Sequence, residues 1–155
     1  MSLINELVKA TGKLNIEIKG PDGQVKESIY IPNLVVTVGK NYIANRMKDG
    51  TSSFTQQNQM SHMAVGELAT GAVVGDTTLA DELARVALTT AGGTVAGAVV
   101  TYAATFGPGT GTGAIVEAGI FNAASSGTML CRTTFAVVNK GVDDTMSITW
   151  TVTIS

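Results

Sequence analysis

The sequence has few charged residues. Asp, Glu, Lys and Arg make up 14% of the 155 residues, whereas about 25% is usual for a soluble domain. Because surface charge keeps monomers soluble and apart, this deficit indicates that much of the surface is covered in use. Gly, Ala and Thr are abundant instead, and such small residues suit flat, closely packed sheets. The composition favours a single structural domain that works by contact with other protein surfaces.

Reactive residue types are scarce as well. His62 is the only histidine and Cys131 the only cysteine, so an internal disulfide framework is excluded. A hydrolytic triad or a zinc site would have to use His62. Cys131 lies within an apolar run, where a buried core thiol is the usual role, and neither residue has a catalytic motif around it. We therefore expect no enzyme activity, no metal and no cofactor.

Other absences narrow the partners. The chain has no run of about 18 apolar residues, so we expect no membrane span, and residues 1–6 lack the features of a signal peptide. Seven of the ten basic residues lie in the first 50 positions, but no dense basic patch with interleaved aromatics argues for nucleic-acid binding. Aromatics make up 5%, which argues against a glycan-binding module, although we keep this module as an alternative.

Alternating apolar and polar residues predict strands along most of the chain. Apolar and polar residues alternate over 14–18, a Pro-Asp-Gly turn follows at 21–23, and residues 25–31 form a second β-prone run. Together these three segments predict a β-hairpin. The clearest run is 146–154, which is long and uncharged. At a sheet edge it would template aggregation. We therefore expect this strand, with Trp150 on its buried face, to be central in a sheet or paired with another subunit.

In two segments the apolar residues are spaced as in a helix. Residues 39–48 place Tyr42, Ile43 and Met47 on one face and predict a helix that ends at Asp49-Gly50. Residues 75–83 carry capping-box spacing and predict a second short helix with Leu79 and Leu83 facing inward. The fold expected from these patterns is mainly β, an antiparallel β-sandwich with the jelly roll as one form of it, and two short helices in its crossovers.

The domain is expected to have two parts. Residues 1–33 would form an N-terminal arm and hairpin, and residues 34–155 the sandwich body. Leu3, Ile4, Leu7 and Val8 have helical spacing at the start of the arm. This start is either an arm that docks on a partner or a terminus folded back on its own domain.

Three charged residues lie in otherwise apolar strands or close the second predicted helix. Charged side chains such as those of Glu117 and Arg132 are rarely buried without a partner. We therefore expect them to form an ion pair, either with each other or with another subunit, which Arg85 could join. We favour pairing within the fold over an intersubunit role, because most such charges are satisfied within their own chain. The glycine-rich stretch 107–113 lacks the Lys-Ser/Thr ending of a phosphate loop and is interpreted as an inter-strand loop.

A set of sequence blocks, taken in order, resembles a recurring structural family of tailed bacteriophages. The blocks are residues 38–44 (VGKNYIA), 62–66 (HMAVG), 75–79 (GDTTL), 82–85 (ELAR), 113–122 (GAIVEAGIFN), 127–132 (GTMLCR) and 147–154 (SITWTVTI). The similarity covers residues 34–155. The chain departs from the family at Glu67-Leu68-Ala69, where small Gly and Thr residues are more usual.

The family resembles virion decoration (cement) proteins, and some relatives are labelled tail or tail-fibre components. The resemblance implies a β-sandwich made in the bacterial cytoplasm that binds the outside of an assembled capsid, with the major capsid protein as partner, as a homo-oligomer of two or three copies. It transfers no catalytic residue. A tail or tail-fibre component is the alternative. We expect the shell contact within residues 1–30, which carry the basic excess and the amphipathic start; the candidates are Leu3, Ile4, Leu7, Lys9 and Lys13.

Overall fold

A computed structural model describes residues 6–48 and 56–155 of the chain. These residues form nine strands and one helix, which is α1 (Thr37–Met47). The strands are β1 (Ala10–Lys19), β2 (Val25–Val35), β3 (His62–Gly66), β4 (Glu82–Ala87), β5 (Thr94–Ala96), β6 (Val99–Phe106), β7 (Gly113–Phe121), β8 (Met129–Lys140) and β9 (Thr145–Ile154). No helix among the described residues is long and apolar enough to cross a membrane.

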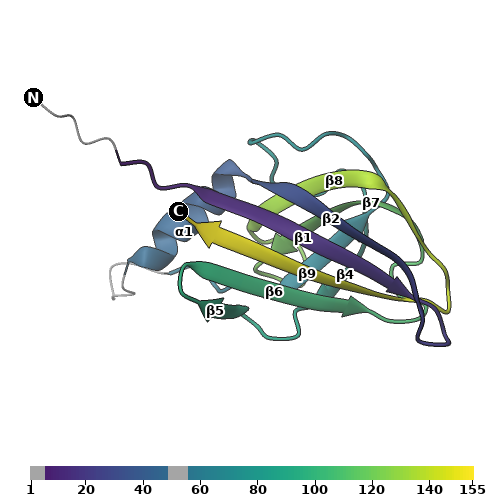
Figure 1. The fold of residues 1–155 in the computed structure, drawn as a ribbon. Coiled ribbons are helices and arrows are strands. Elements are labelled where there is room, and N and C mark those ends of the chain that lie inside the picture. Colours follow the sequence, from purple (N-terminus) through teal and green to yellow (C-terminus); the bar gives the residue numbers. More distant parts are fainter. Residues whose placement is uncertain (1–5, 49–55) are drawn as a thin grey trace, which may run out of the picture.

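The nine strands form one antiparallel sheet in the order β4-β3-β7-β8-β2-β1-β9-β6-β5. This sheet curves into a half-barrel with α1 at one end (Figure 1). The prediction of a mainly β, antiparallel fold is therefore confirmed, whereas the two-sheet sandwich or jelly roll is not. The narrowest join is between β2 and β8, where only Leu34 and Val35 pair with Arg132 and Cys131.

The predicted hairpin is confirmed and lies in the middle of the sheet. Leu14, Ile16 and Ile18 are buried on one face of β1, and Gly23 adopts a φ of 77° in the turn, where its missing Cβ removes the steric penalty. β1 pairs with β9 on its other side, and β2 continues through Pro32 to reach β8. The hairpin is thus part of the half-barrel wall.

The C-terminal strand has the central place expected of it. β9 pairs with β1 over residues 145–154 and with β6 over residues 146–153. Trp150 is fully buried, and its Nε1 donates a hydrogen bond to Asn33 Oδ1 at 2.9 Å. The two neighbouring strands satisfy the backbone of this apolar strand and remove the aggregation risk of an edge.

The prediction of a second helix at 75–83 is wrong. Residues 75–81 form turns and bends, and strand β4 begins at Glu82. The cause is a tertiary partner, because the Glu117 carboxylate accepts hydrogen bonds from the backbone N–H groups of Ala80 and Asp81. Those donors therefore need no helical carbonyl. Leu79 is buried as expected, but Leu83 is 40% exposed.

The apolar residues form two clusters on opposite faces of the sheet. The larger fills the inside of the half-barrel and includes Trp150, Phe106, Ile120 and Tyr102. The smaller lies on the outer face, and its members are Val36, Ala64, Leu79, Phe121 and Met129. Leu79 belongs to the β3–β4 connection, so this connection lies over the outer face of the sheet. Burial on both faces explains why β7 is apolar almost throughout.

Candidate functional site

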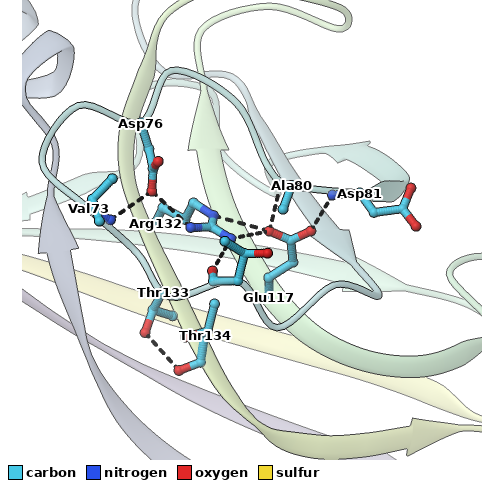
Figure 2. Close-up of polar contacts among 9 residues, drawn as sticks. Val73, Asp76, Ala80, Asp81, Glu117, Arg132, Thr133 and Thr134 are labelled. Atoms are coloured by element: carbon cyan, nitrogen blue, oxygen red, sulfur yellow. Dashed lines mark hydrogen bonds and ion pairs between the residues drawn. The ribbon is translucent and has the colours of Figure 1, made fainter.

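The predicted pairing of Glu117 and Arg132 is present within the fold. Glu117 lies on β7 and Arg132 on β8, and both side chains are almost completely buried. Arg132 Nη2 lies 2.8 Å from Glu117 Oε2, and Nε donates to the same oxygen at 3.1 Å. Figure 2 shows the guanidinium and the carboxylate facing one another beneath the β3–β4 connection. Each buried charge is therefore compensated by the other.

The rest of the Arg132 guanidinium holds the β3–β4 connection in place. Nη1 bonds Asp76 Oδ2 at 2.8 Å, and Nη2 donates to the carbonyl of Thr70 at 2.7 Å. Asp76 Oδ2 also accepts the backbone N–H of Val73 (Figure 2). Together with the Glu117 bonds to residues 80 and 81, these contacts attach the connection at both of its ends. The network thus joins β7, β8 and the β3–β4 connection through buried polar contacts.

Arg85 makes a separate set of contacts on β4. It forms an ion pair with Glu82 at 2.6 Å and donates to the carbonyls of Ala123 and Ser126. Its guanidinium lies 3.8 Å from the ring centroid of Phe121, a cation–π geometry. The suggestion that Arg85 joins Glu117 and Arg132 is not supported by these contacts. Arg85 instead ties β4 to the β7–β8 turn.

His62 and Cys131 point to opposite faces of the sheet. His62 is paired with Phe121, whose side chain lies on the outer face, whereas Cys131 is paired with Ile120 and packs inside the half-barrel. Burial raises the pKa of the Cys131 thiol, which disfavours the reactive thiolate. His62 Nδ1 lies 2.8 Å from the hydroxyl of Ser61. Within the described residues, no three His, Cys, Asp or Glu side chains gather as a metal site would require.

The glycine-rich stretch 107–113 joins β6 to β7 and packs against the β8–β9 turn. Lys140 Nζ donates to the carbonyl of Gly107, and the N–H of Gly109 donates to the carbonyl of Val142. Burial lowers the pKa of the Lys140 ammonium, although Asp144 acts in the opposite direction. The loop runs from strand to strand, so it lacks the helix N-terminus that a phosphate loop uses.

Asp144 caps the β8–β9 turn. Its carboxylate accepts two hydrogen bonds from Lys26 Nζ, at 2.8 and 3.0 Å, and one from the backbone N–H of Gly141. The hydrogen bonds from Lys26 and Gly141 lower the pKa of Asp144 below its ordinary value. Asp144 therefore has a structural role in the turn, as Glu82 has in its ion pair with Arg85.

An apolar recess lies beside α1. Figure 1 shows α1 and the C-terminus at the same end of the half-barrel. An inner part of about 370 Å³ lies between α1, β6 and β9, and an outer part of about 670 Å³ lies between α1 and the start of β1. The two parts share Ile43, Met47 and Ile154, so they adjoin one another. We call this recess the helix groove; its apolar lining is Val8, Ala10, Tyr42, Ile43, Met47, Val95, Val100, Tyr102, Leu130, Val152 and Ile154.

Basic side chains surround the helix groove. Lys9 and Lys40 line its outer part and Arg46 its inner part, while no acidic side chain is among the described residues that line it. Met47 is 83% exposed, although it lines the inner part of the groove together with buried Tyr42. As far as residues 6–48 and 56–155 show, the groove is therefore an exposed apolar surface bordered by basic side chains, which is typical of an interaction site.

The backbone of Gly39 sets the position of α1 on the sheet. A Cβ atom on Gly39 would lie 1.9 Å from the carbonyl oxygen of Leu130 on β8, so only glycine permits this approach. One turn later, the Tyr42 hydroxyl accepts a hydrogen bond from the N–H of Met60 at 3.2 Å. Burial raises the pKa of Tyr42. These contacts fix the helix wall of the groove.

Of the N-terminal candidates within the described residues, Lys9 lines the groove. Leu7 is 65% exposed, and Lys9 and Lys13 are exposed as well. Lys9 exchanges two backbone hydrogen bonds with Ser155, so the chain leaves the sheet at this point. Leu3 and Ile4, like the predicted helix stop at Asp49-Gly50, lie outside the described residues. The apolar walls of the groove come from six separate segments of the chain, so no local sequence pattern predicts it. The one local signal was the predicted helix face with Tyr42, Ile43 and Met47.

Comparison of the chain with protein-family models, with curated proteins and with solved structures found no match.

Proposed function

We propose that this chain is a capsid decoration (cement) protein that binds the outside of an assembled phage head and stabilises it. The observation that carries the proposal is the uncovered surface at one end of the half-barrel, where the helix groove, Leu7 and Val8 are apolar and Lys9, Lys40 and Arg46 are basic. Such a surface suits contact with another protein. The ordered resemblance to phage virion proteins supplies the kind of partner, the major capsid protein.

The internal use of charge supports a structural role. Glu117, Arg132, Asp76 and Asp144 are all engaged in ion pairs within the chain. His62 and Cys131 face opposite sides of the sheet. With these charges used inside the fold, the exposed surface is the part of the molecule that suits binding. The low overall charge agrees with a surface that a partner covers.

Cement activity follows from mass action. A protein that binds the assembled shell but not its dissociated subunits stabilises the shell by the free energy of binding. A shell repeats one site many times, and an oligomer that bridges neighbouring capsomers gains further through effective concentration. Individual contacts smaller than the standard interface of about 1,600 Å² therefore suffice.

Cosedimentation with expanded, undecorated shells tests the proposal. We expect the purified protein to sediment with shells and to raise their resistance to heat or chelation. Lys9→Glu with Lys13→Glu should weaken this binding at least 10-fold, because both ammonium groups are exposed on the proposed contact side. Lys19→Glu, at the far end of β1, makes the charge change of one of these two substitutions and should bind as the wild type does. A wild-type protein that stays in the supernatant overturns the proposal.

The same assay separates the alternatives. Sedimentation with purified tails, and not with heads, would assign the chain to the tail. For a glycan-binding module, Tyr30 is the only large aromatic exposed among the described residues, and Trp150 is buried. Binding on a glycan array at micromolar concentration, without binding to heads or tails, would favour that module.

A further inference from the structure

We infer that the helix groove binds the N-terminal segment of a second copy, residues 1–8, so that the protein assembles by exchange of arms. The inference goes beyond the proposed function, because it concerns self-association and would hold whatever the assembled oligomer binds. It divides the surface at this end of the half-barrel: the groove, Leu7 and Val8 make the contact between copies, and the basic side chains Lys9 and Lys13 are left for the shell.

The described part of the arm is apolar and uncovered in a single chain. Leu7 is 65% and Val8 is 75% exposed. Lys9 is held to Ser155 by backbone hydrogen bonds in both directions, so the chain beyond it continues in the direction of the strand. Figure 1 shows residues 6–9 running out past the end of β1. Val8 lines the mouth of its own groove, and to fill that groove further the arm would have to reverse its direction within residues 6–8.

The arm and the groove are chemically complementary. Among residues 1–8, Leu3, Ile4, Leu7 and Val8 are apolar and Glu6 is the only charged side chain. The groove offers an apolar lining, and its charged rim is basic. An apolar segment with one carboxylate therefore fits it better than the basic remainder of the N-terminal region does.

The dimensions also agree. Eight extended residues span at most about 26–29 Å, which is enough to leave one copy and enter the groove of a neighbour. Val8 lines the outer part of its own groove, so the arm starts at the mouth of the recess. In a dimer the exchange is reciprocal, and in a ring each arm enters the next copy. Each copy then gives one arm and receives one, which closes the assembly.

Sedimentation velocity of the full chain tests the first requirement. We expect the wild type to be an oligomer of the 15.9 kDa chain. Leu7→Asp with Val8→Asp, and separately Met47→Asp, should raise the dissociation constant at least 100-fold and yield monomer. Val142→Asp replaces an exposed apolar residue on the β8–β9 turn and should leave the oligomer intact. A monomeric wild type, or Asp variants that keep its mass, overturns the inference.

Disulfide trapping identifies the occupant. Leu7→Cys and Met47→Cys are introduced in separate chains, which are mixed and oxidised. Because native Cys131 is fully buried, it does not interfere. We expect a cross-link between the two chains. A cross-link that forms only within a chain carrying both substitutions would mean that each arm fills its own groove, and would overturn the exchange. Neither experiment contains a shell, so its outcome is independent of cosedimentation.

Discussion

Arg132 donates two hydrogen bonds to one carboxylate oxygen of Glu117, and neither side chain has appreciable contact with solvent. The pair joins β7 to β8 near the narrow β2–β8 join, where Leu34 is paired with Arg132 itself. It also holds the β3–β4 connection through Asp76 and the N–H groups of residues 80 and 81. One buried ion pair thus organises the outer face of the half-barrel.

Replacing Glu117 with Gln should strongly destabilise the fold. The substitution removes the negative charge that compensates Arg132. It also replaces a carboxylate oxygen with an amide NH₂ group, which cannot accept the hydrogen bonds that Arg132 and the backbone N–H groups of Ala80 and Asp81 donate. Removing one partner of a buried pair costs about 3–5 kcal/mol. The measurement is the free energy of unfolding in urea. Glu82→Gln, in the more exposed pair with Arg85, is the matched control and should cost no more than about 1 kcal/mol. Equal effects of the two substitutions would contradict the assigned role of Glu117.

Gly39→Ala should loosen α1 even though alanine favours helices. The new Cβ would lie 1.9 Å from the backbone oxygen of Leu130, so the helix has to shift. Overpacking costs about 1–3 kcal/mol, and because the contacted atoms belong to the backbone we expect the upper part of this range. That cost exceeds the gain of about 1 kcal/mol in helix propensity. Gly71→Ala, whose Cβ would meet nothing within 4 Å, should change stability by less than about 0.5 kcal/mol. Thermal unfolding of both variants checks the difference.

The thiol of Cys131 should be unreactive in the folded protein. It is completely buried on the inner face of the sheet, and burial raises its pKa, so access and thiolate fraction are both low. A chromogenic thiol reagent at mildly alkaline pH should label it only as fast as the protein unfolds, and at once in denaturant. Rapid labelling of the native chain would show that the thiol reaches solvent.

Asp144 should make stability dependent on acidic pH. The hydrogen bonds from Lys26 and Gly141 lower the pKa of Asp144 from 3.8, so the deprotonated carboxylate is more favourable in the folded state than in the unfolded state. The stabilisation is therefore complete above 3.8 and is lost as the pH falls through the lowered value. Asp144→Asn should be less stable than the wild type at neutral pH, and the gap should close in acid. A gap that is independent of pH would mean that the cost comes from the turn geometry alone.

Sequence patterns correctly predicted the features that depend on residues close to one another in the chain. Leu14, Ile16 and Ile18 repeat every second residue, and this period alone places them on one buried face. Trp150 follows the same rule in β9. The pairing of Glu117 with Arg132 was also predictable, because two charges in apolar strands need partners.

The sequence patterns predicted the wrong structure where residues far away in the chain determine the local conformation. The pattern of residues 75–83 was helical, but the Glu117 carboxylate takes the N–H groups of Ala80 and Asp81 and holds the segment in turns. That contact depends on a strand more than 30 residues away, so no local period could show it.

The sequence by itself determined the mainly β character, the hairpin, the buried faces of the strands and the internal use of the rare charges, because each depends on the spacing of side chains along one segment. Only the tertiary structure decided that the strands form a half-barrel, that one helix exists among the described residues, and that an apolar groove opens beside it. The reason is that strand order and the close approach of Gly39 to Leu130 join segments far apart in the chain, and their contact energies are absent from any local pattern.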